Sequence, residues 1–205
     1  MNKDINNYNN LLELFVRQYQ FEKKNEIFLQ SLKNINLKFT WKQTYDCIQK
    51  LSDYLGRHIS SEDRCMLISE NRPEWLIADL SIMSAKGITV PAYTTYTERD
   101  YEYLINDCKP SLIIVSDNVQ FQKIKNLIQK YNFIKEVISF EKIKEDKVTF
   151  LDEIFNQTNY QEKNLETINL KRKDVACIIY TSGTQGNPKG VMLSHGGILN
   201  NCEGS

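Results

Sequence analysis

The amino-acid sequence predicts an α/β fold, a doubly wound and largely parallel β-sheet with flanking helices. Short apolar runs recur along the chain, and the first four begin at residues 65, 88, 112 and 137, so that 23 to 25 residues separate one start from the next. Each of the three gaps between these runs contains one stretch with helical spacing. A parallel crossover needs a dozen or more residues and usually contains a helix, so this cadence is typical of successive βαβ units.

The predicted strands are nearly continuous apolar sequences, as is usual for strands buried on both faces: residues 65–68, 88–90, 112–115, 137–138 and 175–179. Pro91 directly follows the second run. Because proline has no N–H to donate to a neighbouring strand, we expect that strand to end there.

Three helices are predicted between the first four strands. The first begins near Pro73 and ends by Gly87, since proline is favoured at the first helical position and glycine after the last. The second begins at Thr97 and ends before Pro110, and Thr97 and Asp100 have the spacing of a capping box. The third covers residues 119–131, with apolar side chains along one side.

The N-terminal part contains two further helices and two short strands. Leu12, Phe15, Val16 and Tyr19 have the spacing of a helix with one buried face. Strands are expected at residues 26–30 and 37–40, joined by a turn. Thr40 and Gln43 then form a capping-box pattern for a helix that starts near Trp41 and continues to Gly56. Residues 141–147 and 157–164 are polar enough to be exposed connections.

Composition excludes several classes of protein. The 205 residues include 26 basic and 26 acidic side chains, so the balance gives no sign of a nucleic-acid-binding protein. No apolar run approaches the roughly 20 residues of a membrane-spanning helix, and the polar N-terminus lacks the apolar core of a signal peptide. Five widely spaced cysteines form no Cys-x-x-Cys pair, which argues against a disulfide framework and a zinc site. We expect an intracellular, soluble protein.

The strongest motif follows the last apolar run, where residues 181–190 read Thr-Ser-Gly-Thr-Gln-Gly-Asn-Pro-Lys-Gly. Its glycines allow the backbone to curl so that N–H groups converge on phosphate oxygens, and Lys189 adds a positive charge. The spacing differs from a P-loop NTPase, because Pro188 lies where the second glycine would be, and it differs from a dinucleotide fingerprint. A surface turn rich in Gly and Pro is the remaining alternative.

Residues 180–195 closely resemble the signature loop of the adenylate-forming enzymes, which include acyl-CoA synthetases, luciferases and nonribosomal peptide adenylation domains. Residues 71–79 and 87–95 are similar to early segments of the long-chain fatty acyl-CoA synthetases, so the resemblance covers most of the chain after about Leu11. One position departs from the family, which usually has a second threonine where this chain has Gln185. An amide can still donate hydrogen bonds there.

The resemblance implies that the parent protein activates a long-chain fatty acid with ATP and Mg²⁺ as an acyl-adenylate and transfers it to coenzyme A. Thr181, Ser182 and Thr184 would donate hydrogen bonds to the phosphates, together with Gln185. Gly183 and Gly186 would permit close approach, and Lys189 would offset the charge of the departing pyrophosphate. A fatty-acid substrate is also compatible with peripheral contact between the parent protein and the cytoplasmic face of a membrane.

The resemblance further implies that residues 1–205 are the N-terminal part of an AMP-binding domain, truncated and without its C-terminal lid domain. The family's catalytic, ribose-binding and magnesium-binding residues lie farther along, so we expect this piece alone to be inactive and to bind ATP weakly. Two alternatives stay open. The chain could be a non-catalytic nucleotide- or phosphate-binding module, or the parent could adenylate another carboxylic acid.

Several polar and aromatic residues outside the loop have both a structural and a functional interpretation. For His195 we favour packing or local hydrogen bonding over proton transfer. For Arg72 we favour a solvated helix start over an anion site. Some aromatic residues could line an acyl tunnel but are more often core: Trp75, Tyr93, Tyr96, Tyr101 and Tyr103.

Overall fold

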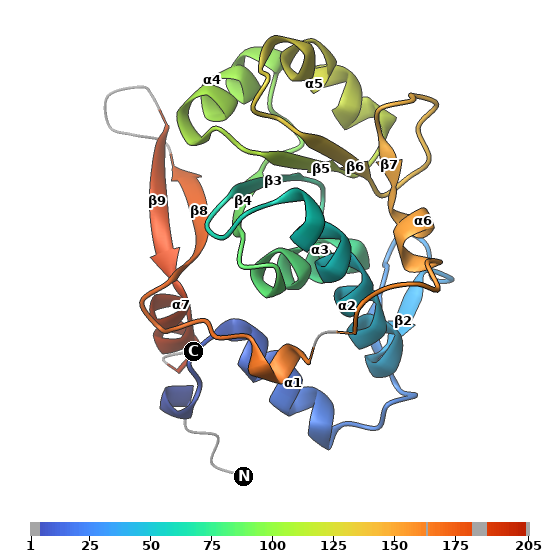
Figure 1. The fold of residues 1–205 in the computed structure, drawn as a ribbon, viewed down its shortest axis with the longest axis vertical. Helices are drawn as coiled ribbons and strands as arrows, with labels where there is room; N and C mark the ends of the chain where they lie inside the picture. Colours follow the sequence, from blue (N-terminus) through green and yellow to red (C-terminus); the bar gives the residue numbers. More distant parts are fainter. Residues whose placement is uncertain (1–4, 163, 182–187, 204–205) are drawn as a thin grey trace.

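The computed structural model describes residues 5–162, 164–181 and 188–203 (Figure 1). In this part of the chain the central sheet has seven strands in the order β7-β6-β5-β3-β4-β8-β9. Their bounds are β3 Arg64–Ile68, β4 Ile88–Ala92, β5 Leu112–Val115, β6 Glu136–Ser139, β7 Thr149–Phe150, β8 Val175–Thr181 and β9 Lys189–Ser194.

The sheet is parallel except for its last pair, β8 and β9, which is antiparallel. From β3 the chain passes to β4 on one side and then crosses back to β5 and β6 on the other side. The five predicted strands are all present, and the fold class is confirmed. Pro91 is the last residue but one of β4, close to the strand end that it predicts.

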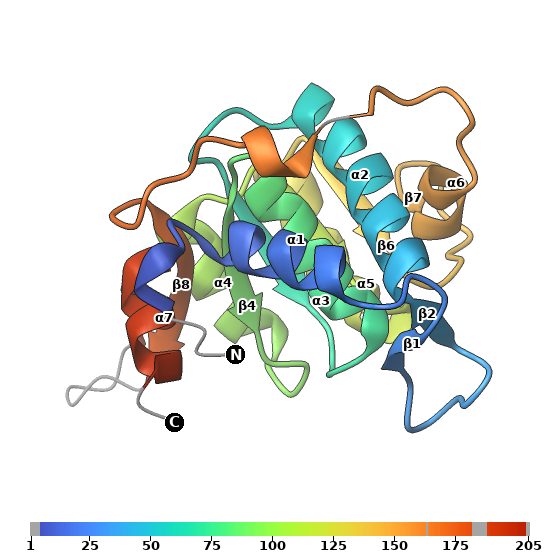
Figure 2. The same cartoon turned by 90° about the horizontal axis from the view of Figure 1, so that it is seen from below.

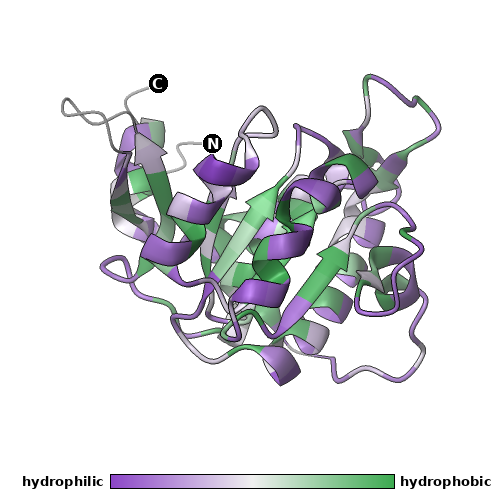
Figure 3. Ribbon diagram, turned by 90° about the horizontal axis from the view of Figure 1, so that it is seen from above, coloured by the Kyte–Doolittle hydropathy of each residue, from purple (hydrophilic) through white to green (hydrophobic). Residues whose placement is uncertain are grey.

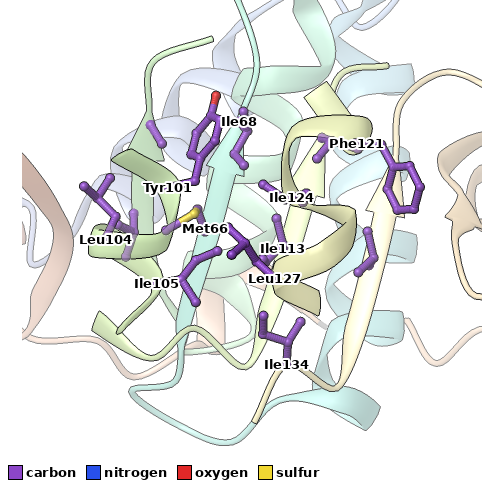
Figure 4. Close-up of a cluster of buried hydrophobic side chains, with 14 of the residues drawn as sticks. Met66, Ile68, Tyr101, Leu104, Ile105, Ile113, Phe121, Ile124, Leu127 and Ile134 are labelled. Atoms are coloured by element: carbon purple, nitrogen blue, oxygen red, sulfur yellow. The ribbon is translucent and has the colours of Figure 1, made fainter. Parts of the chain in front are cut away.

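Helices α4 (Glu98–Cys108) and α5 (Asn118–Lys130) cover one face of the sheet. Figure 4 shows Tyr101, Leu104 and Ile105 of α4 and Leu127 of α5 packed around Met66 and Ile113 from the sheet. Removing such side chains from water is the main source of stability in a domain of this size. The predicted capping box at the start of α4 is present, with Thr97 as its N-cap residue.

The opposite face is covered by α2 (Trp41–His58), α3 (Pro73–Ser84) and the short α6 (Leu151–Phe155). Helices on both faces make the sheet doubly wound. Helix α1 (Leu11–Phe21) adds an outer layer, because its apolar side packs on α2 and α3 rather than on the sheet (Figure 2). The ribbon is accordingly hydrophobic in the central strands and hydrophilic on the outward sides of the helices (Figure 3).

Smaller elements complete the described part of the chain. Strands β1 (Ile27–Gln30) and β2 (Lys38–Thr40) form an antiparallel pair that leads into α2, whose capping box at Thr40 is also present. Short 3₁₀ helices are η1 Ile5–Asn7 and η2 Leu165–Thr167, and α7 covers His195–Glu203. No helix of the described residues combines the length and apolar character needed to cross a bilayer.

Three features differ from the sequence prediction or go beyond it. Strand β7 and helix α6 have only 2 and 5 residues, too few to show a periodic pattern. Strand β9 is not among the five strands predicted for the sheet, because it is mostly exposed and shows no buried apolar run. It returns antiparallel to β8, and the sequence pattern indicated neither this direction nor this pairing.

Candidate functional site

The β8–β9 hairpin carries the phosphate-loop motif. Thr181, the last residue of β8, is the Cα partner of Lys189, the first residue of β9. Both side chains are exposed. The other predicted ligands, Ser182, Gly183, Thr184, Gln185 and Gly186, lie outside the described residues. The structure therefore brings together the two ends of the predicted site.

The hairpin emerges at the carboxyl edge of the parallel sheet. Strand β8 is parallel to β4, and β4 is parallel to β3, so all three strands end at the same edge. The helix that follows β3 lies on one face, whereas the helices that follow β4 and β5 lie on the other. Ligands of open α/β sheets bind in the crevice beyond the carboxyl ends, where the chain direction reverses in this way.

A cavity of about 440 Å³ opens at this edge, within the size range of small-molecule sites. It is lined by Trp75 of α3 and by residues at the ends of β3, β4 and β8: Ser69, Glu70, Asn71, Pro91, Ala92, Tyr93, Thr94, Ile179 and Tyr180. Its lining is mainly apolar, with aromatic and aliphatic side chains and a few polar ones. Among the described residues, no group of three or more His, Cys, Asp or Glu side chains is placed to hold a metal ion.

Two side-chain hydrogen bonds join helix α4 to this hairpin in the described part of the chain. The Tyr103 hydroxyl donates a hydrogen bond to the Pro188 carbonyl oxygen at 2.9 Å, and the Tyr180 hydroxyl donates to Asp107 at 2.5 Å. Burial, followed by the Asp107 carboxylate, raises the pKa of Tyr180 above its usual range. The phenol therefore remains a hydrogen-bond donor at neutral pH.

His195 is structural, as the sequence analysis favours. Its side chain is 1% exposed, and Nδ1 accepts a hydrogen bond from the Leu11 N–H at the start of α1, with 3.4 Å between the nitrogens. Burial lowers the pKa of His195, although the Asp174 carboxylate acts in the opposite direction. A neutral imidazole that accepts at Nδ1 ties the beginning of α7 to α1.

Arg72 differs from the prediction of a solvated helix start. Its side chain is only 13% exposed, and the guanidinium pairs with Glu74 at 2.8 Å, with Glu141 at 3.1 Å and with Glu70 at 3.8 Å. These partners bind the start of α3 to the end of β6. Three surrounding carboxylates also oppose an additional anion at this position.

The aromatic residues divide between core and cavity. Tyr101 is fully buried, and its hydroxyl donates to the Tyr93 carbonyl oxygen at 2.8 Å. Tyr96 packs against the same core. Trp75 and Tyr93 line the cavity, and Tyr93 is 66% exposed.

One residue near the hairpin was missed by sequence reasoning. Asp79 lies on α3, and burial raises its pKa to about 6, with a weaker opposing effect of the Thr89 hydroxyl. Thr89 and Cys177 are Cα partners across β4 and β8. Burial and then the charge of Asp79 raise the pKa of Cys177 to about 11. An acidic residue in the middle of a largely apolar helix was the available signal.

Comparison with curated proteins finds relatives among fatty acyl-CoA ligases. Long-chain-fatty-acid–CoA ligase ACSBG2 of Gallus gallus is 31% identical over 169 residues, which cover 78% of this chain and 22% of that protein. Long chain acyl-CoA synthetase 4 of Arabidopsis thaliana is 29% identical over 170 residues, which cover 78% of this chain and 25% of that protein. The chain thus spans about a quarter or less of the length of these relatives.

Solved structures share the fold. The anthranilate CoA ligase AuaEII, crystallised with anthranoyl-AMP, superposes with a TM-score of 0.79 at 20% identity over 92% of this chain and 35% of that chain. ATP-bound MatB from Rhodopseudomonas palustris gives a TM-score of 0.73 at 24% identity over 95% of this chain and 36% of that chain. A family model described as AMP-binding enzyme matches residues 17–205, nearly the whole sequence. The chain therefore belongs to the AMP-binding enzyme family.

Proposed function

We propose that residues 1–205 form the N-terminal part of the adenylation domain of an ATP-dependent long-chain fatty acyl-CoA ligase. The observation that carries this proposal is the placement of Thr181 and Lys189 side by side at the carboxyl edge of the sheet, next to a 440 Å³ cavity. The long-chain acyl-CoA ligases among the relatives support the substrate class.

The proposed reaction has two steps. The carboxylate of the fatty acid attacks the α-phosphorus of ATP, which forms the acyl-adenylate and releases pyrophosphate. The thiol of coenzyme A then attacks the acyl carbon, which forms the thioester and releases AMP. Mg²⁺ would arrive with ATP, since this ion commonly binds through substrate phosphates and keeps several waters.

The loop residues have an electrostatic role in this proposal. Thr181, Ser182, Thr184 and Gln185 donate hydrogen bonds to the β- and γ-phosphates, and Gly183 and Gly186 let the backbone approach them. Lys189 then offsets the charge that develops on pyrophosphate as the bond to the α-phosphate breaks. Donors fixed in advance at such a position lower the barrier because they need no reorganisation during the reaction.

Pyrophosphate exchange in the protein expressed from its complete gene tests the proposal. ATP should incorporate labelled pyrophosphate only when a long-chain fatty acid is present. Lys189→Ala should lower the exchange rate by about 10²-fold, the usual effect of losing a donor to developing charge. Lys173→Ala is the matched control, because Lys173 is an exposed lysine just before the opposite end of β8. Equal exchange in the two variants would remove Lys189 from the mechanism.

Another carboxylic acid is the second candidate substrate. A mycosubtilin synthase of Bacillus subtilis is 28% identical over 164 residues, which cover 80% of this chain and 6% of that protein, so the relatives extend beyond fatty acyl-CoA ligases. The same exchange assay with short-chain, aromatic and amino acids distinguishes the two. Faster exchange with any of these than with a long-chain fatty acid would favour the second candidate.

A non-catalytic nucleotide- or phosphate-binding module is the alternative outside enzymes. It requires the 205-residue chain to bind its ligand unaided, whereas the ligase proposal expects weak binding because phosphate contacts alone do not orient adenine and ribose. Calorimetric titration of this chain with magnesium-ATP separates them. Micromolar affinity would support the module.

The ligase proposal also concerns where in the cell the parent protein acts. A fatty-acid substrate partitions into lipid, so we propose an intracellular protein that makes peripheral contact with the cytoplasmic face of a membrane. Co-sedimentation with phospholipid vesicles checks this part separately.

A further inference from the structure

Helix α4 holds the β8–β9 hairpin on both sides of the loop. Tyr103 bonds to the carbonyl of Pro188, which directly precedes Lys189, and Asp107 bonds to the hydroxyl of Tyr180, which directly precedes Thr181. Tyr103 and Asp107 are four residues apart and therefore lie on the same side of the helix, one turn from each other. Figure 1 shows α4 beside the ends of β8 and β9 that carry these residues.

The hairpin is joined to the parallel part of the sheet by a short ladder. In the described part of the chain, the ladder between β4 and β8 pairs Thr89 with Cys177 and does not extend toward the loop. Beyond Cys177, β8 is paired with β9, which is the edge strand of the sheet. The side-chain bonds from α4 thus add connections near the loop to those that the sheet provides.

The position of Asp107 also argues for a specific role. It lies in the last turn of α4, where a carboxylate interacts unfavourably with the helix dipole, and that turn contains no basic residue. The cost is offset by the bond from Tyr180, whose side chain is 5% exposed. Gly190 faces the same ring, since a Cβ added there would lie 3.3 Å from Cζ of Tyr180. The ring is therefore held between α4 and β9.

We infer that Tyr103 and Asp107 are positioning residues, which fix Thr181 and Lys189 relative to each other for binding phosphate. This inference rests on the proposed function of the loop. Neither residue touches the phosphates. Each acts through a residue adjacent to a predicted ligand, so its loss should weaken ATP binding more than it weakens the fold.

The test compares matched Tyr→Phe variants in the protein expressed from its complete gene. Tyr103→Phe and Tyr180→Phe each remove one hydroxyl that bridges α4 and the hairpin. Tyr131→Phe is the control, because the Tyr131 hydroxyl also bonds to α4, at Glu102, but on the side away from the hairpin. In pyrophosphate exchange, Tyr103→Phe and Tyr180→Phe should each raise the KM for magnesium-ATP about two- to tenfold, the usual effect of losing one hydrogen bond.

Three further readouts separate positioning from general loss of stability. The KM for the fatty acid and the midpoint of thermal unfolding should match those of Tyr131→Phe. Asp107→Asn should keep the ATP KM near that of the original protein, because the amide oxygen still accepts from Tyr180, whereas Asp107→Ala should raise it. An unchanged ATP KM in both Tyr103→Phe and Tyr180→Phe, or the same rise in Tyr131→Phe, would overturn the inference.

Lys189→Ala in the same assay distinguishes failure of this inference from failure of the proposed function. If Lys189→Ala loses exchange while the tyrosine variants match the control, only the positioning role is wrong. If Lys189→Ala is unaffected, the phosphate role of the loop is wrong, and the inference fails with it.

Discussion

Replacing Asp79 by asparagine should stabilise the chain at neutral pH but not in mild acid. Burial of the carboxyl group on α3 raises its pKa to about 6, above the ordinary value of 3.8. The folded state therefore prefers the protonated form. The stability contributed by this preference is fully present below about pH 4 and is lost as pH rises through about 6. The asparagine side chain would be uncharged throughout and would not suffer that loss.

The magnitude follows from the shift. One pKa unit corresponds to about 1.4 kcal/mol, so a shift of about two units sets an upper value near 3 kcal/mol. Asp79 is partly rather than fully buried, so solvent screening reduces this. We expect Asp79→Asn to raise the free energy of unfolding by about 1–2 kcal/mol at pH 7.5, with a gain close to zero near pH 4.

Urea unfolding of both proteins at the two pH values measures this difference. His195 contributes equally to the two proteins, so its titration cancels in the comparison, and the Cys177 thiol stays protonated at both pH values because its pKa is about 11. Asp146→Asn serves as the control, because it makes the same Asp-to-Asn change at an exposed carboxylate. An Asp79→Asn gain that is the same at both pH values would refute the burial argument.

Three further predictions concern the elements around the hairpin. Burial lowers the pKa of His195 in the folded state. The stability that His195 contributes is therefore present above about pH 6.5 and is lost as pH falls through the lower pKa of the folded state. His195→Gln should remove this part of the pH dependence in urea unfolding. A Cβ added at Gly190 would lie 2.9 Å from a side-chain carbon of Ile178, so Gly190→Ala should cost about 1–3 kcal/mol in thermal unfolding, whereas Gly197→Ala, whose nearest atom is 3.4 Å away, should not. Thr97→Ala removes the capping box of α4 and should cost about 1 kcal/mol, measured as a lower urea midpoint.

Five of the seven strands of the central sheet and helices α2 to α5 were predictable because local sequence determines them. Residues 112–115 are fully buried on both faces, and such a strand shows as a continuous apolar run. Helices α2 and α4 were found from capping boxes at Thr40 and Thr97, both of which are formed. The order of the strands was not predictable, since it depends on which side of β3 each crossover returns to.

The loop could be identified from the sequence because its ten motif residues are adjacent. The residues that surround it in space could not be identified in this way. The partners of Tyr103 and Asp107 are 85 and 73 residues away along the chain. Arg72 shows the same limit. Its partners Glu70 and Glu74 are neighbours in sequence, but Glu141 is 69 residues away, so the sequence around Arg72 gave no sign of this third carboxylate.

The rotational orientation of α4 links the capping box at its start to these long-range contacts. The cap at Thr97 fixes where the helix begins, and a turn of about 3.6 residues then determines the direction of each side chain. Tyr101, Leu104 and Ile105 consequently face the sheet, while Tyr103 and Asp107 face the hairpin. A start shifted by one residue would rotate all of them by about 100° and would separate the hairpin from its two partners. The capping box therefore contributes to the geometry of the proposed phosphate site, although it lies more than 80 positions before the loop in the sequence.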